Sequence, residues 1–358
     1  MPRSTRTLER MKTVACVAAT AADKPLEKST LDRRDLRDDD IMIEVEYSGI
    51  CHSDIHTVRG EWGPCHYPMS PGHEIIGRIV ETGPAVTGFE VGERVGVGCL
   101  VDSCGECEQC LAGQQQDCLN GNVGTYNSKD RRDGSITQGG YSTHIPVSQD
   151  FAIHIPESLD PAAAAPLLCA GITTYSPLAR FGAGPGTKVA VVGMGGLGHM
   201  AVKLAAAMGA EVTVISHSHA KEDDGRRFGA VDYVATGDDP RALDRLRGAF
   251  DLIINTISAP FDAVDYLRAL KPHGAMVLVG LPPEPMKIPA GALIGGGKIL
   301  AGSNIGGIPQ TQEMIDFCAE HGITAEIELI GADQINEAYD RVVDSDVRYR
   351  FVIDAKTF

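Results

Sequence analysis

The sequence predicts an α/β protein with a β-rich, barrel-like domain and a doubly wound parallel-sheet domain. From about residue 11 to 158, short β-like runs are separated by Gly and Pro turns, which is typical of a barrel-like domain. From about 159 to 301, apolar strands alternate with helices, which is typical of a buried parallel sheet. A glycine-rich loop after the first of these strands supports the same fold class.

The β-rich domain is expected to span residues 1–158 and to be completed by residues 302–358. Its strands should alternate apolar and polar side chains, as half-buried strands do. They are expected at Ile41–Tyr47, Ile75–Val80 and Arg94–Val97, with a last strand at Arg350–Ile353 that rejoins this domain. Residues 1–10 are interpreted as a loose extension.

The parallel-sheet domain is expected to span residues 159–301. Its strands should be continuous apolar runs, because both faces of a parallel sheet are covered by helices. They are expected at Lys188–Val192, Glu211–Ser216, Asp251–Asn255, Ala275–Gly280 and Lys298–Gly302. Helices are expected at Leu197–Met208 and Phe261–Leu270.

A G-x-G-x-x-G motif follows the first of these strands and opens an apolar helix. The motif runs through Gly193, Gly195, Gly196, Leu197 and Gly198. Its first glycine permits a tight turn, its second lets a pyrophosphate approach the backbone, and its third lets helix and strand pack closely. The sequence therefore predicts a dinucleotide cofactor at this helix N-terminus.

The end of the second strand predicts which dinucleotide binds. NAD-binding folds often place a carboxylate there to bind the ribose 2′-hydroxyl. Here the strand ends in Ser216, His217 and Ser218, with Lys221 shortly after. Hydroxyls and a lysine can hold a 2′-phosphate, so NADP is predicted over NAD. Glu222 and Asp223 follow directly, and they keep NAD open as the alternative.

Charge and cysteine usage limit the partners and the compartment. The chain has 48 Asp and Glu against 32 Lys and Arg, a net charge of −16, which disfavours a nucleic-acid partner. No apolar run approaches the roughly 20 residues of a membrane helix. The apolar stretch Val14–Ala22 resembles a short signal peptide, but we interpret it as a first strand running into a loop.

Ten cysteines are present, and five of them fall within residues 99–118. Such clustering in a long chain indicates metal ligands in a reducing compartment, so a cytoplasmic location is expected. The spacing Cys-x2-Cys-x2-Cys-x7-Cys suits a closed, structural zinc site. Its members are Cys104, Cys107, Cys110 and Cys118. An iron–sulfur cluster is the alternative, but Cys118 comes late and precedes Leu119 rather than proline.

A second, dispersed set of metal-ligating residue types contains Cys51, His73 and Cys169, with Glu74 next to His73. Three protein ligands with one open position are typical of catalytic zinc. Spacing alone does not assemble this set, because Cys169 also fits a small buried apolar residue.

Four segments together resemble the zinc-dependent medium-chain alcohol dehydrogenases. They are Gly49–Asp54, Pro71–Glu74, the four-cysteine segment and Gly193–Gly198. Their order and spacing match that family from residue 11 onward. The segments Cys169–Tyr175, Ser216–Lys221 and Ala301–Asn304 are similar to its NADP-dependent cinnamyl-alcohol-dehydrogenase branch, which includes broad-range aldehyde reductases. The resemblance implies a GroES-like catalytic domain and two zinc ions per chain.

The resemblance also implies roles for individual residues. Cys51, His73 and Cys169 bind the catalytic zinc, with Glu74 as an occasional or outer ligand. The other implied catalytic residues are Asp54, which holds the far nitrogen of His73, Ser53 and His56, which move the proton, and Thr173, which presses on the nicotinamide. His52, Thr256, Gly280, Ser303, Asn304 and Arg348 are implied cofactor contacts. Trp62, Leu100 and Tyr126 line the expected substrate pocket. Cys65 and Cys99 have no assigned role.

The function expected from these residues is hydride transfer between NADP(H) and primary alcohols or aldehydes with aromatic or alkyl groups. One alternative is an NAD-dependent polyol or short-alcohol dehydrogenase of the same superfamily. A second alternative is a non-catalytic redox or structural protein on the same scaffold. The resemblance implies a homodimer formed through sheet edges of the cofactor domain, with neither nucleic acid nor membrane as a partner.

Overall fold

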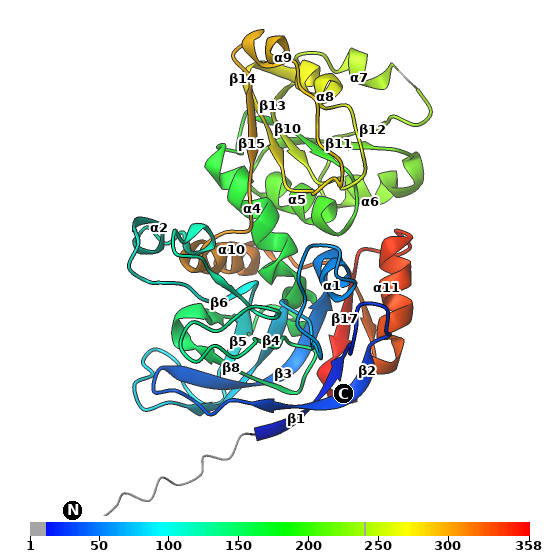
Figure 1. The fold of residues 1–358 in the computed structure, drawn as a ribbon. Coiled ribbons are helices and arrows are strands. Elements are labelled where there is room, and N and C mark those ends of the chain that lie inside the picture. Colours follow the sequence, from blue (N-terminus) through cyan, green and yellow to red (C-terminus); the bar gives the residue numbers. More distant parts are fainter. Residues whose placement is uncertain (1–11, 240) are drawn as a thin grey trace, which may run out of the picture. The chain divides into compact units, whose positions relative to one another are not determined.

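The computed structural model describes residues 12–239 and 241–358, which form two compact units (Figure 1). The first comprises residues up to Leu168 together with Ile327–Phe358, and the second comprises Cys169–Glu326. The predicted domain boundaries, after residues 158 and 301, lie earlier in the chain than these two unit boundaries. The predicted domain limits remain a prediction. The extension predicted at residues 1–10 lies outside the described residues.

The first unit is built on a sheet with strand order β16-β17-β3-β4-β5-β9, and β8 also pairs with β3. Its strands are β3 (Asp40–Ile50), β4 (Ile75–Thr82), β5 (Arg94–Val97), β8 (His144–Ser148), β9 (Ile153–His154), β16 (Ile327–Ile330) and β17 (Arg350–Asp354). Strand β17 runs antiparallel to β3, with Phe351 opposite Ile50. The prediction that the last strand rejoins this domain is confirmed.

Two smaller strand pairs complete the β-structure of this unit. Strand β1 (Lys12–Ala18) pairs antiparallel with β2 (Glu27–Arg33). Buried Val14, Cys16 and Val17 anchor β1, so the apolar stretch near the N-terminus is a strand, as expected. Strands β6 (Leu100–Asp102) and β7 (Val123–Gly124) pair with each other. The segment between them, which carries Cys104, Cys107, Cys110 and Cys118, is called the lobe below.

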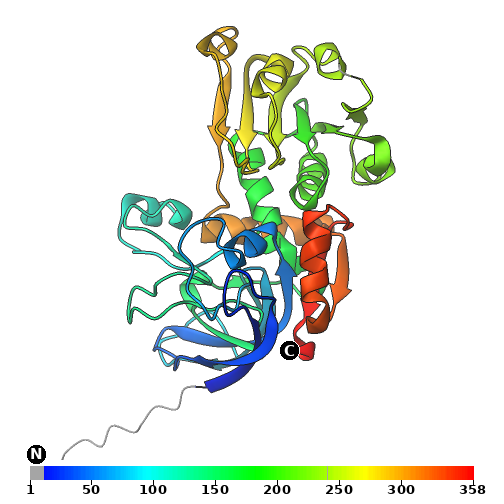
Figure 2. The ribbon, with the colours of Figure 1, turned by 45° about the vertical axis from the view of Figure 1, so that its right-hand side comes forward.

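Short helices connect these strands. They are α1 (His52–Val58), α2 (Glu108–Leu111), α3 (Pro161–Ala164) and α11 (Ile335–Val343), with 3-10 turns η1 (Gln115–Asp117), η2 (Gln149–Phe151), η3 (Ala165–Leu168), η5 (Ala332–Gln334) and η6 (Ala355–Thr357). Helix α11, red in Figure 2, packs against α1. The core between them includes Ile55, Tyr141, Ile335, Tyr339 and Phe351. Ile50 and Ile55 of the same core flank Cys51, the residue that caps α1.

The second unit contains a parallel sheet with strand order β12-β11-β10-β13-β14-β15. Its strands are β10 (Lys188–Val192), β11 (Glu211–Ser216), β12 (Asp232–Ala235), β13 (Phe250–Asn255), β14 (Leu270–Leu278) and β15 (Ile299–Gly302). In chain order this is 3-2-1-4-5-6, the arrangement of a doubly wound dinucleotide-binding sheet. The predicted fold class is confirmed.

Helices connect the strands of this sheet and flank it in the chain (Figure 1). They are α4 (Ala170–Arg180), α5 (Gly196–Ala207), α6 (Glu222–Arg227), α7 (Ala242–Arg245), α8 (Ala263–Ala269), α9 (Ala290–Ile294) and α10 (Ile308–His321), with a 3-10 turn η4 (His219–Lys221). No single helix among the described residues is long and apolar enough to cross a membrane. One bent pair, Pro161–Leu168 with Ala170–Arg180, reaches that limit by length and composition alone.

Candidate active site and metal centres

Cys51 lies where strand β3 ends and helix α1 begins. It is the N-cap of α1, and Asp54 is the third residue of that helix. The Cys51 N–H donates to Oδ2 of Asp54 at 2.9 Å, and the Asp54 N–H donates to the Cys51 carbonyl at 3.0 Å. This reciprocal cap stabilises a short helix that would otherwise be marginal. The same carboxylate therefore fixes the backbone of the predicted metal ligand.

His73 lies in the buried segment that leads into strand β4. Its Nδ1 is 3.0 Å from Oδ1 of Asp54, which leaves Nε2 as the ring atom that can bind a metal. The Gly72 N–H donates to the same oxygen at 3.2 Å, and Gly72 has a φ of 103°, which favours glycine. The Tyr126 ring stacks on the imidazole with 5.9 Å between centroids.

Cys169 follows Leu168, the residue at which the main segment of the first unit ends. A Cβ added at Gly98 would lie 2.9 Å from the Leu168 carbonyl oxygen, so glycine permits this close approach. The ligand atoms of Cys51, His73, Glu74 and Cys169 all lie within 4.8 Å of one another, and all four residues are buried. The structure thus brings together the set that spacing alone could not assemble.

Glu74 adds a buried carboxylate beside this group. Its Oε1 accepts a hydrogen bond from the guanidinium of Arg350, whereas its Oε2 is buried without a hydrogen-bond partner. Burial raises the pKa of Glu74, whereas the neighbouring Arg350 guanidinium lowers it and favours the charged carboxylate. A Cβ added at Gly49 would lie 2.0 Å from Oε2, so only glycine fits there.

The donor set of this buried group fits a zinc ion. The group contains two thiols and one imidazole whose far nitrogen is engaged by a carboxylate. It also contains a buried carboxylate oxygen without a hydrogen-bond partner. A dication stabilises all of these groups. Cys51, His73 and Cys169 are the residues that would hold the ion, and three protein ligands leave a position for substrate.

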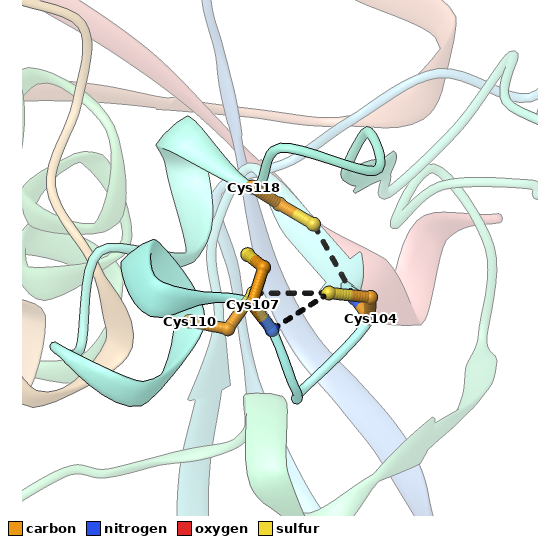
Figure 3. A group of neighbouring side chains, drawn as sticks. All are labelled: Cys104, Cys107, Cys110 and Cys118. Carbon is orange, nitrogen blue, oxygen red and sulfur yellow. Dashed lines mark hydrogen bonds between the residues drawn. The ribbon is translucent and has the colours of Figure 1, made fainter.

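The second group comprises the four cysteines of the lobe, whose sulfurs face one another (Figure 3). The sulfurs of Cys104 and Cys110 are 3.8 Å apart. A tetrahedral zinc site with Zn–S bonds of about 2.3 Å requires a sulfur–sulfur separation of roughly 3.8 Å. An iron–sulfur cluster would separate the thiolates much further, because several iron atoms lie between them. The geometry favours a single ion.

Main-chain N–H groups point at the sulfurs of this lobe. The Cys107 N–H donates to Cys104 at 3.3 Å, and the Leu119 N–H donates to Cys107 at 3.4 Å. Main-chain donors, first that of Glu106, lower the pKa of Cys104 to about 6, and those of Cys110 and Leu119 lower the pKa of Cys107. Burial instead raises the pKa of Cys110 to about 11. The loop is already arranged for thiolate ligands at two of its four positions.

The glycine loop between β10 and α5 has the geometry that its motif predicts. Gly193 has a φ of 92°, and a Cβ at Gly198 would lie 2.1 Å from the Gly193 carbonyl oxygen. A Cβ at Gly195 would meet no heavy atom of the described residues within 4 Å. The first glycine therefore makes the turn, the third permits close packing, and the second leaves space for a pyrophosphate.

The loop after β11 carries serine hydroxyls that could bind a phosphate, and the Glu222 carboxylate that follows them is already paired with other side chains. Ser216 ends the strand, and Ser218 caps the short turn η4. Glu222, which kept NAD open as the alternative, pairs with Arg226 at 2.8 Å and with His219 at 2.6 Å. These partners lower the pKa of Glu222 and balance its charge.

Comparisons with known proteins agree with this geometry. Residues 37–157 match the alcohol dehydrogenase GroES-like domain, and residues 196–320 match the zinc-binding dehydrogenase domain. The chain is 58% identical over 345 residues to NADP-dependent alcohol dehydrogenase C 1 of Mycolicibacterium smegmatis, covering 96% of this chain and 98% of that protein. This chain belongs to the zinc-type medium-chain alcohol dehydrogenases.

Further relatives support the membership. Aldehyde reductase YahK of Escherichia coli is 49% identical to this dehydrogenase over 96% of its chain and 99% of the relative. A Sorghum bicolor cinnamyl alcohol dehydrogenase structure superposes with a TM-score of 0.93 at 45% identity, covering 96% of this chain and 98% of that chain. The Helicobacter pylori enzyme complexed with NADP(H) gives 0.91 at 40% identity, covering 97% and 99%.

The predicted proton-transfer residues of this dehydrogenase lie on α1. Ser53 Oγ is 3.5 Å from the sulfur of Cys51. The His56 ring stacks between His52 and Trp62, with centroid distances of 4.6 and 4.8 Å. Trp62 is half exposed, at 50%, so the structure places it beside His56 rather than in the core. The catalytic roles of these residues remain predictions.

The other predicted contacts lie on both units of the dehydrogenase. Leu100 is buried at the start of β6, and Arg348 is exposed just before β17. Thr173 is buried in α4, and Thr256 Oγ1 donates to the Val192 carbonyl at 2.8 Å. Gly280, Ser303 and Asn304 follow the strand ends of β14 and β15. Their binding roles remain predictions.

Sequence reasoning missed Arg350, which contacts Glu74. A signal was present, because a charged side chain opens an apolar strand (Arg-Phe-Val-Ile) and a buried charge needs a partner. It also missed Tyr141, which is fully buried and whose hydroxyl donates to Asp54. No local pattern marks this tyrosine, because its partners are distant in the sequence.

Proposed function

We propose that this chain is an NADP-dependent alcohol dehydrogenase that interconverts primary alcohols and aldehydes carrying aromatic or alkyl groups. The observation that carries the proposal is the buried group of Cys51, His73 and Cys169, with Asp54 engaging the far nitrogen of His73. The printed names of relatives at 49–58% identity, an NADP-dependent alcohol dehydrogenase and an aldehyde reductase, support the same reaction class.

A zinc ion held by these three ligands would polarise the carbonyl oxygen, and NADPH would supply the hydride. Asp54 holds His73 in the tautomer whose Nε2 can bind a metal. Ser53, close to the Cys51 sulfur, donates a hydrogen bond to the substrate oxygen and passes a proton to it. His56, which is partly exposed, takes up a proton from solvent and returns it to Ser53, which restores the Ser53 hydroxyl.

The cofactor preference rests on the loop after β11. Ser216, Ser218 and Lys221 hold the 2′-phosphate by hydroxyl donors and a cation. Glu222 does not oppose this charge, because Arg226 and His219 engage its carboxylate. The pyrophosphate lies against the N-terminus of α5, where an added Cβ at Gly195 would meet open space.

A spectrophotometric assay tests this function. NADPH oxidation is measured with benzaldehyde, cinnamaldehyde and short alkyl aldehydes, and compared with NADH under the same conditions. We expect turnover with a higher kcat/KM for NADPH. Oxidation of polyols with NAD but no aldehyde reduction by NADPH would indicate the NAD-dependent alternative. No turnover from a zinc-loaded, folded protein would indicate a redox or structural role.

We also propose a homodimer formed through strand β15. In the described part of the second unit, β15 is an edge strand, and Ile299 on it is 45% exposed. Ile294 and Leu281 nearby in the sequence are 78% and 64% exposed, and such apolar edges favour pairing. Ile299→Lys should give a monomer by light scattering, whereas Leu329→Lys, on edge strand β16, should not. A dimeric Ile299→Lys protein would contradict this interface.

A cytoplasmic location is supported by the state of the cysteines. Six of the ten cysteines belong to the two metal-ligand groups. Free metal-binding thiols require a reducing compartment. Cell fractionation should therefore recover the protein with cytoplasmic markers, and export with oxidised thiols would contradict the proposal.

A further inference from the structure

Tyr141 places a buried hydroxyl next to the carboxylate that orients His73. Its side chain is fully buried, and its Oη is 3.5 Å from Oδ2 of Asp54. The Oη of Tyr339, on α11, is 3.4 Å from the Oη of Tyr141. Tyr339 donates to Tyr141, and Tyr141 donates to Asp54. Two hydroxyls thus extend the Asp54–His73 pair toward the C-terminal helix.

The Tyr141 ring also supports the residue before His73. A Cβ added at Gly72 would lie 2.6 Å from the ring, so the ring packs directly on the Gly72 backbone. The Tyr141 N–H donates to the Pro71 carbonyl at 2.9 Å, and the Gly140 N–H donates to the Gly72 carbonyl at 3.0 Å. The loop around Tyr141 therefore fixes both the backbone and the hydrogen-bond partner of the predicted ligand.

Arg33 holds this loop from its other side. The guanidinium is buried and donates to the carbonyls of Gln138, Gly139 and His144 at 2.6, 2.7 and 2.8 Å. A fourth bond goes to Ser142 Oγ at 2.6 Å. A buried cation with several fixed acceptors leaves the loop little freedom. The position of Tyr141 is therefore set independently of Asp54.

The hydrogen bonds at Asp54 divide between its two oxygens. Oδ1 accepts from His73 Nδ1 and from the Gly72 N–H, whereas Oδ2 accepts from the Cys51 N–H and from the Tyr141 hydroxyl. Asp54 itself is fully buried, so each lost donor is not replaced by bulk water. Burial raises the pKa of both Tyr141 and Tyr339, so both hydroxyls keep the protons that they donate.

We propose that Tyr141 is a positioning residue for the catalytic zinc, acting through Asp54 on His73, with Tyr339 behind it. This inference rests on the proposed function, because it requires a zinc ion at His73. Partners of ligating histidines orient the ring, and their loss typically weakens metal binding about 10–100-fold. The Tyr141 hydroxyl acts one contact further out, so we expect a smaller effect of about threefold to tenfold.

Zinc release from the holoenzyme tests the proposal. Tyr141→Phe keeps the ring that packs on Gly72 and removes only the hydroxyl. We expect its catalytic zinc to transfer to a chelator about threefold to tenfold faster, while the four-cysteine zinc transfers at the wild-type rate. Cobalt placed at the catalytic site should show a shifted visible absorption spectrum. Tyr339→Phe should act in the same direction with a smaller effect.

A matched control separates positioning from general stability. Tyr175→Phe also removes a buried hydroxyl, which bonds Glu313 at 2.7 Å in the second unit. This variant should lower the melting temperature without changing zinc release. If Tyr141→Phe lowers only the melting temperature and leaves zinc release and the cobalt spectrum unchanged, the proposal is wrong. A wild-type protein that holds zinc only in the four-cysteine lobe would instead contradict the proposed function.

Discussion

The guanidinium of Arg350 donates to Oε1 of Glu74, joining residues that are 276 positions apart in the sequence. The side chains are 6% and 0% exposed, so the ion pair is buried. Strand β17 carries Arg350 to the site because it pairs with the end of β3, next to Cys51. The last strand of the chain thus completes the surroundings of the predicted catalytic metal.

Breaking this buried pair should be costly. Glu74→Gln or Arg350→Met leaves a buried charge without its partner, and such losses cost about 3–5 kcal/mol. We expect the melting temperature of each zinc-loaded variant to fall by roughly 5–10 °C. The double variant should be more stable than the sum of the two losses predicts. Asp333→Asn removes an exposed pair with Lys28 and should change the melting temperature little.

Asp54→Asn tests the orientation of His73. The substitution keeps the shape of the side chain but removes the charge that engages Nδ1 and the acceptor for the Cys51 N–H. We expect kcat/KM for aldehyde reduction to fall about 10–100-fold, together with weaker retention of the catalytic zinc. Wild-type activity with a wild-type zinc content would exclude this role for Asp54.

Cys107→Ser tests the structural metal centre. Loss of one thiolate should reduce zinc from two ions per chain to one and lower the melting temperature, because metal binding stabilises this lobe. Cys65→Ser removes a thiol outside both metal groups and is the matched control, with no change in zinc content expected. Equal zinc content and equal melting temperatures in the two variants would argue against a zinc site in the lobe.

Ser216→Asp tests the cofactor preference. A carboxylate at the end of β11 repels a 2′-phosphate and can bind a ribose 2′-hydroxyl. We expect the ratio of kcat/KM for NADPH over NADH to fall about 10–100-fold, the range of one charge-assisted contact. Lys221→Ala should lower kcat/KM for NADPH and leave that for NADH unchanged. An unaltered ratio in both variants would place the 2′-phosphate elsewhere.

The sequence predicted the elements whose residues carry a strong periodic or apolar pattern. The strands at Lys188–Val192 and Arg94–Val97 have the bounds expected, and the parallel-sheet fold follows from such runs. Strand β2 was missed because its sequence, Glu-Lys-Ser-Thr-Leu-Asp-Arg, is polar and mostly exposed, and its pairing with β1 defines it. The helix expected to end at Leu270 ends one residue earlier, where β14 begins.

The residues of the candidate site also divide into those that a local sequence pattern predicts and those that only the folded chain brings together. The four cysteines of the lobe were predicted from spacing, because they lie within fifteen residues of one another. Assembly of Cys51, His73 and Cys169 required family resemblance, and their proximity is a property of the folded chain. Arg350 and Tyr141 were not predicted at all. Their roles depend on strand pairing and loop contacts that no local pattern encodes.

The central claim is that Cys51, His73 and Cys169 form a catalytic zinc site for NADPH-dependent aldehyde reduction. The most direct measurement compares wild-type and Cys169→Ser proteins for benzaldehyde-dependent NADPH oxidation, with zinc content determined on the same samples. We predict turnover by the wild type, and loss of turnover with one zinc retained in a folded Cys169→Ser protein. Undiminished turnover by Cys169→Ser would contradict the claim.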